Sequence, residues 1–460
     1  MGPVMRPSFC SSLPASAALL LALAACSPET RNYGSGPSGS SSGSGGGTSC
    51  AAGTDDCDGD GECETNVTDN REHCGGCNVA CQLACKGTTC DDPVHIAAGY
   101  DHTCAVLAGG DLYCWGRNTS RELGIGTLED SPVPVKVPTA GPVVQVSLGG
   151  TSLTDAAGVM KEVAHTCAVL KDTTVQCWGN NVSGQLGIGA SGSQDKPTTV
   201  VSLVGAKEVS AGGRHTCAVT DTGGASGLQC WGLNDVGQIG TGQVGADVEK
   251  AVPVTGLGAD VEHVSAGRDH TCATRADGTL YCWGENGWGR LGIGSQDDQA
   301  SPQLVSLTGV GQVAAGGQHT CALKGGEIFC WGNGYQGQLG IENEYDWEEA
   351  PSVASNVPNA IFVAAGAEGT AAISGDGGNV YMWSSGLALG DGTDNTSYVP
   401  VKLALGDVVE VATGRFHTCA LTKKGQVLCW GGNTHGQVGN GDASDAPLLT
   451  PTPVAWPTMP

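Results

Sequence analysis

The run His102-Thr103-Cys104-Ala105 is followed by Cys114-Trp115-Gly116, and this pair of motifs recurs along the chain. Further copies have their histidine at positions 165, 215, 270, 319 and 417, with Cys-Trp-Gly starting at 177, 230, 282, 330 and 429. A degenerate copy reads Gly369-Thr370-Ala371-Ala372 and then Met382-Trp383-Ser384. Seven copies spaced by about 50 residues predict a closed ring of seven small sheets.

Each copy contains four short extended segments separated by turn residues. An apolar strand such as Val209-Ser210-Ala211-Gly212 comes first, and His-Thr-Cys-Ala and Cys-Trp-Gly form the next two strands. A glycine-bounded loop such as Gly184-Gln185-Leu186-Gly187 leads to a strand that contains proline. Four-stranded blades in a ring are typical of a β-propeller, so we expect an all-β, seven-bladed fold.

The degenerate copy indicates how the cysteines are used. It has lost both of them together, with Ala371 and Met382 in their places. Paired loss is expected of bonded partners, and opposed residues of a hairpin lie within disulfide reach. We therefore predict six disulfides within repeats: Cys104–Cys114, Cys167–Cys177, Cys217–Cys230, Cys272–Cys282, Cys321–Cys330 and Cys419–Cys429.

The shared pattern of Ala-Gly-x-x-His, Trp-Gly and Gly-Gln-Leu-Gly resembles the repeat of the RCC1 (regulator of chromosome condensation) family. The resemblance covers about residues 93–460 and implies a seven-bladed propeller over residues 92–460. It also implies that terminal segments share one blade, so residues 451–454 should pack beside residues 94–98. The cysteines are additions to the family motif. The nucleotide-exchange role of the name-giving member is not expected here, and neither is a small GTPase partner.

Composition narrows the possible partners. The formal net charge is −25, with 46 acidic and 21 basic residues. Such a chain lacks the clustered Lys and Arg that sequence-independent nucleic-acid binding requires, so we expect no nucleic-acid partner. Its 22 cysteines favour an oxidising compartment outside the cytosol.

The N-terminal region has the features of an export signal and an anchor. An apolar run too short to span a bilayer ends in Leu23-Ala24-Ala25-Cys26, which resembles a bacterial lipobox. Residues 1–25 are then a signal peptide, Cys26 is lipidated, and Ser27 favours the outer membrane. An ordinary secretory signal is the alternative, and Met5 could be the true start. Residues 26–49, rich in Gly and Ser, are predicted to form a flexible tether.

Residues 50–91 form a predicted cysteine-rich module. It holds eight cysteines, at positions 50, 57, 63, 74, 77, 81, 85 and 90. Disulfides are expected to stabilise so short a segment, but the sequence does not choose among their pairings. Zinc held by Cys74, Cys77, Cys81 and Cys85 is a less favoured alternative. A calcium loop starting at Asp56 lacks the glutamate needed at its twelfth position, which is Val67. We therefore predict no metal and no cofactor.

The repeated histidines and tryptophans invite functional readings that we do not favour. We expect each motif histidine to fix its Gly-x-x-His bend by bonding backbone, rather than to form a metal or catalytic site. The motif tryptophans are expected to fill the wedges between blades rather than to serve as sugar platforms. No nucleophile elbow or phosphate loop stands outside the repeat, so no catalytic residue is predicted.

Two departures from the repeat are candidate binding loops, because loops on rigid scaffolds often carry binding sites. The first is an insertion at residues 151–163, which we expect to project as a loop containing Thr151, Asp155 and Lys161. The second is an acidic, aromatic stretch with these candidate residues: Glu344, Tyr345, Asp346 and Trp347.

These features together predict a surface-anchored, non-enzymatic binding scaffold whose partner is an extracellular protein or glycan. The alternative is a secreted inhibitor of a cell-wall or β-lactam-recognising enzyme. A hydrolase is the least favoured class.

Overall fold

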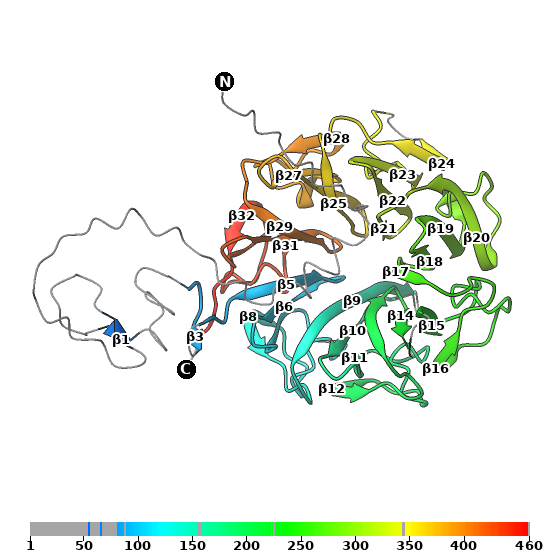
Figure 1. Cartoon of the computed structure of the whole chain (residues 1–460). Coiled ribbons are helices and arrows are strands. Elements are labelled where there is room, and N and C mark those ends of the chain that lie inside the picture. Colours follow the sequence, from blue (N-terminus) through cyan, green and yellow to red (C-terminus); the bar gives the residue numbers. More distant parts are fainter. Residues whose placement is uncertain are drawn as a thin grey trace, which may run out of the picture. The chain divides into compact units, whose positions relative to one another are not determined.

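The protein is a ring of seven four-stranded antiparallel sheets, as the repeats predict (Figure 1). The computed structural model describes residues 54–55, 65–66, 81–86, 89–154, 158–221, 223, 226–342 and 346–458. Within these segments, regular structure is almost entirely β, with two short 3-10 turns. None of the described residues belongs to a helix that is long and apolar enough to cross a membrane.

The blades follow one another in chain order. Blade 1 contains β5 (Pro93–Ala98), β6 (His102–Leu107), β7 (Leu112–Gly116) and β8 (Ser131–Lys136). Blade 2 contains β9 (Val143–Thr154), β10 (Met160–Leu170), β11 (Val175–Gly179) and β12 (Gln194–Thr199). Blade 3 contains β13 (Ala206–Ala211), β14 (His215–Asp221), β15 (Ser226–Gly232) and β16 (Val248–Pro253). Blade 4 contains β17 (Val261–Ala266), β18 (His270–Arg275), β19 (Thr279–Gly284) and β20 (Gln299–Thr308).

The remaining blades have the same plan. Blade 5 contains β21 (Gln312–Ala315), β22 (His319–Lys324), β23 (Glu327–Asn333) and β24 (Trp347–Val353). Blade 6 contains β25 (Ala360–Ala365), β26 (Gly369–Ser374), β27 (Asn379–Ser384) and β28 (Ser397–Lys402). Blade 7 contains β29 (Val408–Thr413), β30 (His417–Thr422), β31 (Val427–Asn433) and β32 (Ser444–Pro453). The turns η2 (Gly287–Gly289) and η3 (Gly386–Ala388) precede the last strands of blades 4 and 6.

The ring is not closed by a shared sheet, so the expectation that terminal segments share one blade is wrong. Strand β32 pairs with β31, and β5 pairs with β6 in a separate sheet. Closure occurs instead through side-chain packing and through hydrogen bonds between blades 7 and 1, such as Gly441 N to Pro132 O at 3.0 Å. Val454 belongs to the same buried cluster as Ile96, and the Trp456 ring lies 5.9 Å from that of Trp115, centroid to centroid. The seventh junction therefore resembles the other six.

Adjacent blades are joined by two hydrogen bonds to a single carbonyl. The carbonyl of Gln185, in the Gly-Gln-Leu-Gly loop of blade 2, accepts from Thr216 Oγ1 and from Trp231 Nε1 of blade 3, both at 2.9 Å. The same pair of bonds occurs at every junction, on these carbonyls: Glu122, Gln185, Gln238, Arg290, Gln338, Ala388 and Gln437. This geometry explains why threonine and tryptophan recur with the cysteines.

Each motif histidine also bonds the next blade, and not its own backbone as we expected. His215 Nε2 lies 2.8 Å from Thr271 Oγ1. Because the threonine hydroxyl gives its hydrogen to a carbonyl, the histidine must donate through Nε2–H. The six pairs are His102–Thr166, His165–Thr216, His215–Thr271, His270–Thr320, His319–Thr370 and His417–Thr103. Blade 6 has Gly369 at this position, so its junction with blade 7 lacks the bond.

All six predicted disulfides within repeats are present, which confirms the pairing. Each joins directly opposed residues of the second and third strands of a blade, as Cys104 faces Cys114 across 4.1 Å between Cα atoms. These cysteines are fully buried and pack with the motif tryptophan of the next blade. In blade 6, Ala371 and Met382 are also opposed, and they fill the same space against Trp430.

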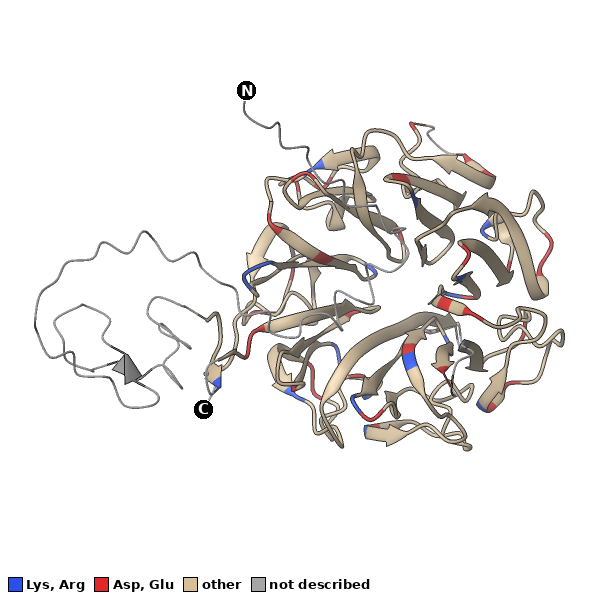
Figure 2. Cartoon of the chain, in the orientation of Figure 1, with Lys and Arg blue, Asp and Glu red and all other residues tan. Residues whose placement is uncertain are grey.

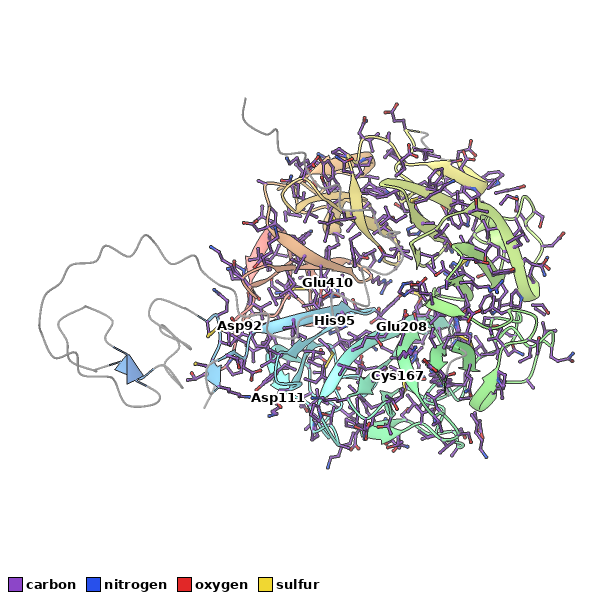
Figure 3. The ribbon with its side chains drawn as sticks, viewed as in Figure 1. Asp92, His95, Asp111, Cys167, Glu208 and Glu410 are labelled. Carbon is purple, nitrogen blue, oxygen red and sulfur yellow. A yellow bond between two sulfur atoms is a disulfide. The ribbon has the colours of Figure 1, made fainter. Side chains whose placement is uncertain are left out.

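Side chains of the first strands, which lie nearest the axis, form hydrogen bonds with the first strands of neighbouring blades. His95 on β5 contacts Glu410 of blade 7 through Nδ1 at 2.7 Å and the Val146 carbonyl of blade 2 through Nε2 at 3.0 Å (Figure 3). Glu410 also accepts from the Ile96 amide. Burial opposes protonation of His95, but the Glu410 carboxylate outweighs it, so the pKa of His95 is raised. Both ring nitrogens therefore donate, and one side chain joins three blades.

The described part of the cysteine-rich module packs on blade 1. The short strands β3 (Cys85–Lys86) and β4 (Thr89–Cys90) form a hairpin, and Cys81 is bonded to Cys90. Cys85 is also in a disulfide, so neither Cys81 nor Cys85 is a zinc ligand. The Asp92 carboxylate accepts from two module amides, those of Gln82 and Leu83. Residues 56–60, 74 and 77, and the lipidation candidate Cys26, lie outside the described residues.

Candidate binding face

The strand order places two kinds of connection at one end of the ring. In an antiparallel meander, the turn after the first strand and the turn after the third strand lie at the same end. The first is the Gly-x-x-His bend, here called the inner bend, and the second is the loop with Gly-Gln-Leu-Gly, here called the outer loop. We call this end the mouth face and the opposite end the base face. Both predicted binding loops therefore belong to the mouth face.

A ring of glycines narrows the axis at the mouth face. The amide after each inner-bend glycine donates to the glycine carbonyl of the next blade at four junctions, for example Gly213 N to Gly267 O at 3.1 Å. A Cβ on Gly212 would lie 2.4 Å from the Gly267 carbonyl oxygen, so no larger residue fits without a shift. The same close approach recurs around the ring, at Gly149, Gly267, Gly316, Gly366 and Gly414. This contact explains the invariance of glycine among the repeats.

A small pocket lies on the axis above these glycines. Its volume is about 120 Å³, and its walls are the inner bends of all seven blades. Three large side chains line it: Tyr100, Arg268 and Arg415. The Arg415 guanidinium lies 4.4 Å from the centroid of the Tyr100 ring. The pocket therefore combines main-chain groups with two guanidinium groups and a phenol.

The insertion at residues 151–163 is not a loop, which corrects our expectation. It extends β9 to Thr154 and starts β10 at Met160, so blade 2 carries a long antiparallel hairpin. Thr151 pairs with Val163 and is buried, whereas Lys161 is exposed. Asp155 lies outside the described residues. Paired strand residues thus form the described part of this insertion.

The hairpin contacts blades 1 and 7. The Glu162 carboxylate accepts from Arg415 Nη1 at 2.6 Å, and its main-chain carbonyl accepts from Arg117 Nη2 and from Ser120 Oγ. Burial, followed by the nearby Glu162 carboxylate, raises the pKa of Asp101 to about 6. The hairpin is therefore bonded to Arg415, which lines the axial pocket. Its Glu162 carboxylate lies near that of Asp101.

The second predicted loop is part of an aromatic cluster. Asp346 and Trp347 are exposed at the start of β24, and 36% of Trp347 is accessible. Glu344 and Tyr345 lie outside the described residues. Trp347 packs with Trp288 of blade 4 and Tyr335 of blade 5, at ring-centroid distances of 5.7 and 6.4 Å. We call Trp288, Tyr335 and Trp347 the aromatic corner.

The motif histidines and tryptophans are unavailable to ligands. All six histidines and all seven tryptophans have no accessible surface. Burial lowers the histidine pKa values, to about 3 at His165 and His319 and to about 4 at His215 and His417. They are neutral structural donors, and the tryptophans fill the wedges between blades as the sequence predicts.

The sequence alone did not point to several residues of the mouth face. Tyr100, Arg268 and Arg415 occupy the first variable position of the Gly-x-x-His bend. Comparing that position across the repeats would have revealed them, because other blades have Gly or Ala there. Trp288 could have been found as one of three tryptophans outside the seven repeat copies of the motif, the degenerate copy included.

This seven-bladed, disulfide-joined β-propeller matches a known repeat. Models of the regulator of chromosome condensation (RCC1) repeat match residues 109–153, 174–219, 228–274, 277–323, 325–373 and 424–459, and a second model of that repeat matches five further ranges between residues 94 and 437. The chain belongs to the RCC1-repeat family. The first five ranges of the first model begin inside one blade and end in the next, so that repeat and the blade are out of phase.

Named relatives agree with this assignment. The chain is 31% identical to the ultraviolet-B receptor UVR8 of Arabidopsis thaliana over 76% of its length and 79% of the receptor. It is 29% identical to the human E3 ubiquitin-protein ligase HERC2 but spans only 7% of that protein. Among solved structures, human WBSCR16 is similar with a TM-score of 0.65 and 24% identity, over 75% of this chain and 95% of that one. Yeast RCC1 (Prp20) has a TM-score of 0.64 and 19% identity, over 79% and 85%.

Proposed function

We propose that the protein is a non-enzymatic binding scaffold, anchored by lipid at Cys26 and presenting its mouth face to an extracellular protein or glycan. One observation carries this proposal: the two predicted binding loops and the axial pocket all belong to the mouth face. The repeated histidines and cysteines, which could otherwise react or bind a ligand, are buried within and between the blades. Binding proteins commonly carry variable loops on a rigid, regular scaffold.

The attachment of the module supports display of this face. Asp91 of the module side accepts from the Gly109 amide, and Lys86 contacts Asp111; both partners lie in the turn between β6 and β7. That turn belongs to the base face. The described residues of the module therefore contact the propeller at its base face, which is the end opposite the mouth face.

Export is the second part of the proposal. Seven disulfides join pairs of described residues, and disulfides persist in oxidising compartments. We propose an outer-membrane lipoprotein, with residues 26–49 as its tether. Radiolabelled palmitate should be incorporated into the wild type and not into Cys26→Ser, and external protease should remove the propeller from intact cells. Labelling that survives in Cys26→Ser would overturn the anchor.

Two exposed valines of blade 2 allow the binding face to be tested. Val182 is 57% exposed in an outer loop of the mouth face, and Val204 is 70% exposed on the base face. Each is replaced by cysteine in the full chain and coupled to polyethylene glycol, and partners captured from extracellular material are identified by mass spectrometry. The polymer at position 182 should abolish capture, while the polymer at position 204 should not.

The same experiment separates the partner classes. Capture of penicillin-recognising enzymes with loss of their activity would favour the inhibitor alternative. Capture blocked equally at both positions, or turnover of a substrate by the purified chain, would overturn the proposal. We do not propose a nucleic acid as partner, because the chain carries 25 more negative than positive charges. We do not propose a small GTPase either, because an exported chain would not meet one.

A further inference from the structure

The aromatic corner is formed by two blades and reaches solvent. Trp288 lies in η2 of blade 4, Tyr335 lies in the outer loop of blade 5, and Trp347 begins β24. The Trp288 ring meets Tyr335 at 5.3 Å and 87° and meets Trp347 at 5.7 Å and 63°. None of the three side chains is buried. They form one continuous aromatic surface rather than three isolated rings.

The backbone at Trp288 is in an unfavourable conformation. Its φ is 65°, in the left-handed region that residues with a side chain rarely adopt. The corresponding residues of blades 2 and 3, Ser183 and Val236, do not have positive φ. Glycine would meet the backbone requirement at lower energy. Nine described residues other than glycine have positive φ, and Trp288 is the one aromatic residue among them.

The border of the corner is acidic, and its carboxylates have hydrogen-bond donors but no ion-pair partner among the described residues. Asp346, Glu348 and Glu349 flank Trp347, and acidic residues mark β24 in Figure 2. Among the described residues, no Lys or Arg forms an ion pair with these three carboxylates. In blade 5, the main-chain carbonyl of Glu349 accepts from the outer loop of blade 4. The residues that make the same bond in blades 2 and 3 are each followed by a lysine, Lys196 and Lys250.

Blade 5 has Ala350 at the position of those lysines. Glu348 and Glu349 are half-buried, and their carboxylates accept from Ser352 Oγ and Gln296 Nε2, but no lysine stands beside them as it does in blades 2 and 3. Negative charge beside an exposed aromatic surface favours a cation, since a guanidinium or ammonium group is attracted to both the ring face and the carboxylate.

We propose that the aromatic corner binds an Arg- or Lys-rich segment of a protein partner. The guanidinium or ammonium groups stack on Trp288 and Trp347 and pair with Asp346, Glu348 and Glu349. This inference rests on the proposed function and names the chemistry of the partner. A neutral sugar could stack on the same rings, but it would leave the carboxylates without a charge partner. Charge complementarity thus favours the basic peptide.

The test measures binding of a fluorescent nona-arginine peptide to the full chain, with a nona-citrulline peptide of the same shape but no charge as comparison. Trp288→Gly removes one ring and relieves the left-handed backbone, so it should fold at least as well as the wild type. Combined with Trp347→Ala, it should weaken binding about tenfold, the loss expected for two cation–π contacts. Glu348→Gln/Glu349→Gln should weaken it by a similar factor and reduce its salt dependence.

A matched control lies on blade 3. Asp247→Asn/Glu249→Gln removes the same charge, and Glu249 bonds the preceding outer loop as Glu349 does. It should leave the affinity within about twofold of the wild type, because screening limits distant exposed charges. Equal losses in both pairs would show that only net charge matters. Citrulline binding as tight as arginine binding would also overturn the proposal.

Two further outcomes are decisive. Binding of neutral chitohexaose that is lost in Trp288→Gly/Trp347→Ala, without binding of the arginine peptide, would assign the corner to a glycan and overturn the basic-peptide proposal. If polymer at position 182 blocks capture of a partner by the full chain while the corner variants capture it normally, the corner proposal fails and the proposed function stands. Folding of each variant is checked by circular dichroism.

Discussion

His417 of the last blade donates from Nε2 to Thr103 Oγ1 of the first blade across 2.9 Å. The threonine in turn donates to the Gln437 carbonyl of blade 7 at 2.8 Å. Two residues 314 positions apart thus complete a relay that other blades form between neighbours. The ring is held at its terminal junction by the same side-chain chemistry as elsewhere, without any exchange of strands.

Removing this histidine should open the terminal junction. His417→Ala removes a buried hydrogen bond and leaves a cavity, so we expect the free energy of unfolding to fall by about 2–4 kcal/mol. Urea denaturation followed by tryptophan fluorescence measures the change. Lys423→Ala, on an exposed turn of the same blade, should have almost no effect. Equal stability of His417→Ala and the wild type would show that the junction does not depend on the relay.

A disulfide engineered into blade 6 should strengthen it. Ala371 and Met382 face each other directly, as the bonded cysteines do in the other blades. Ala371→Cys/Met382→Cys should form the bond and stabilise the protein by at most about 3 kcal/mol, the chain-entropy value for so short a loop. Loss of the methionine side chain against Trp430 offsets part of this gain.

Calorimetry and a count of free thiols by mass spectrometry check the engineered bond. Ala371→Cys alone, which has no partner, is the control and should not be stabilised. Thiols that remain free in the double variant would show that the register of blade 6 differs from that of the bonded blades.

Acid should unfold the propeller through its motif histidines. Their pKa values are lowered by burial, to about 3 at His165 and about 4 at His417, whereas an unfolded histidine titrates near 6.5. Below about pH 6.5 the unfolded chain therefore binds more protons than the folded one, so stability is present above that pH and is lost as the pH falls. Each of the six contributes up to about 1.4 kcal/mol per pH unit.

Three other histidines oppose this trend weakly. The pKa values of His95, His263 and His435 are raised, with Glu410, Glu208 and Asp130 as their carboxylate partners. Their contribution is present below about pH 6.5 and is lost as the pH rises through their folded values. The net expectation is a steep loss of stability between about pH 6 and pH 4, measured by urea midpoints at each pH. An unchanged midpoint over that range would contradict it.

Deleting the hairpin should leave the ring intact. Removing residues 151–163 joins Gly150 to Ala164 and gives Gly149-Gly150-Ala164-His165, which restores the Gly-x-x-His bend of the other blades. The loss of partly exposed ion pairs from Glu162 should change the free energy of unfolding by only about 1 kcal/mol. Partner capture should be lost, whereas Lys171→Ala on the base face should retain it. Normal capture after the deletion would exclude the hairpin from the binding face.

Much of this architecture could be predicted because it repeats. The cysteine pair at positions 104 and 114 recurs in five other copies at separations of 9 to 13 residues, which was enough to assign the blades and their disulfides. Ring closure was mispredicted because a family resemblance suggested shared strands, and only coordinates show that β32 and β5 belong to different sheets. The partner of each histidine was also missed, since a repeated residue can bond its own repeat or the next with the same sequence signal.

The binding face was predictable only in part. Residues 151–163 and Trp347 were found as departures from the repeat, but an insertion that lengthens two paired strands has the same length as one that forms a loop. Trp288 is far from Trp347 in sequence, and their contact depends on how the outer loop of blade 4 packs against β24. Such contacts between blades have no signature within a single repeat.

Because every blade is one uninterrupted stretch of chain and the last junction is bonded like the others, the propeller has no privileged starting point. A circular permutant that begins at blade 4 and links blade 7 to blade 1 should fold to the same ring. Such permutants would let an engineer choose which blade carries the N-terminal segment, and so set the orientation in which the mouth face is presented.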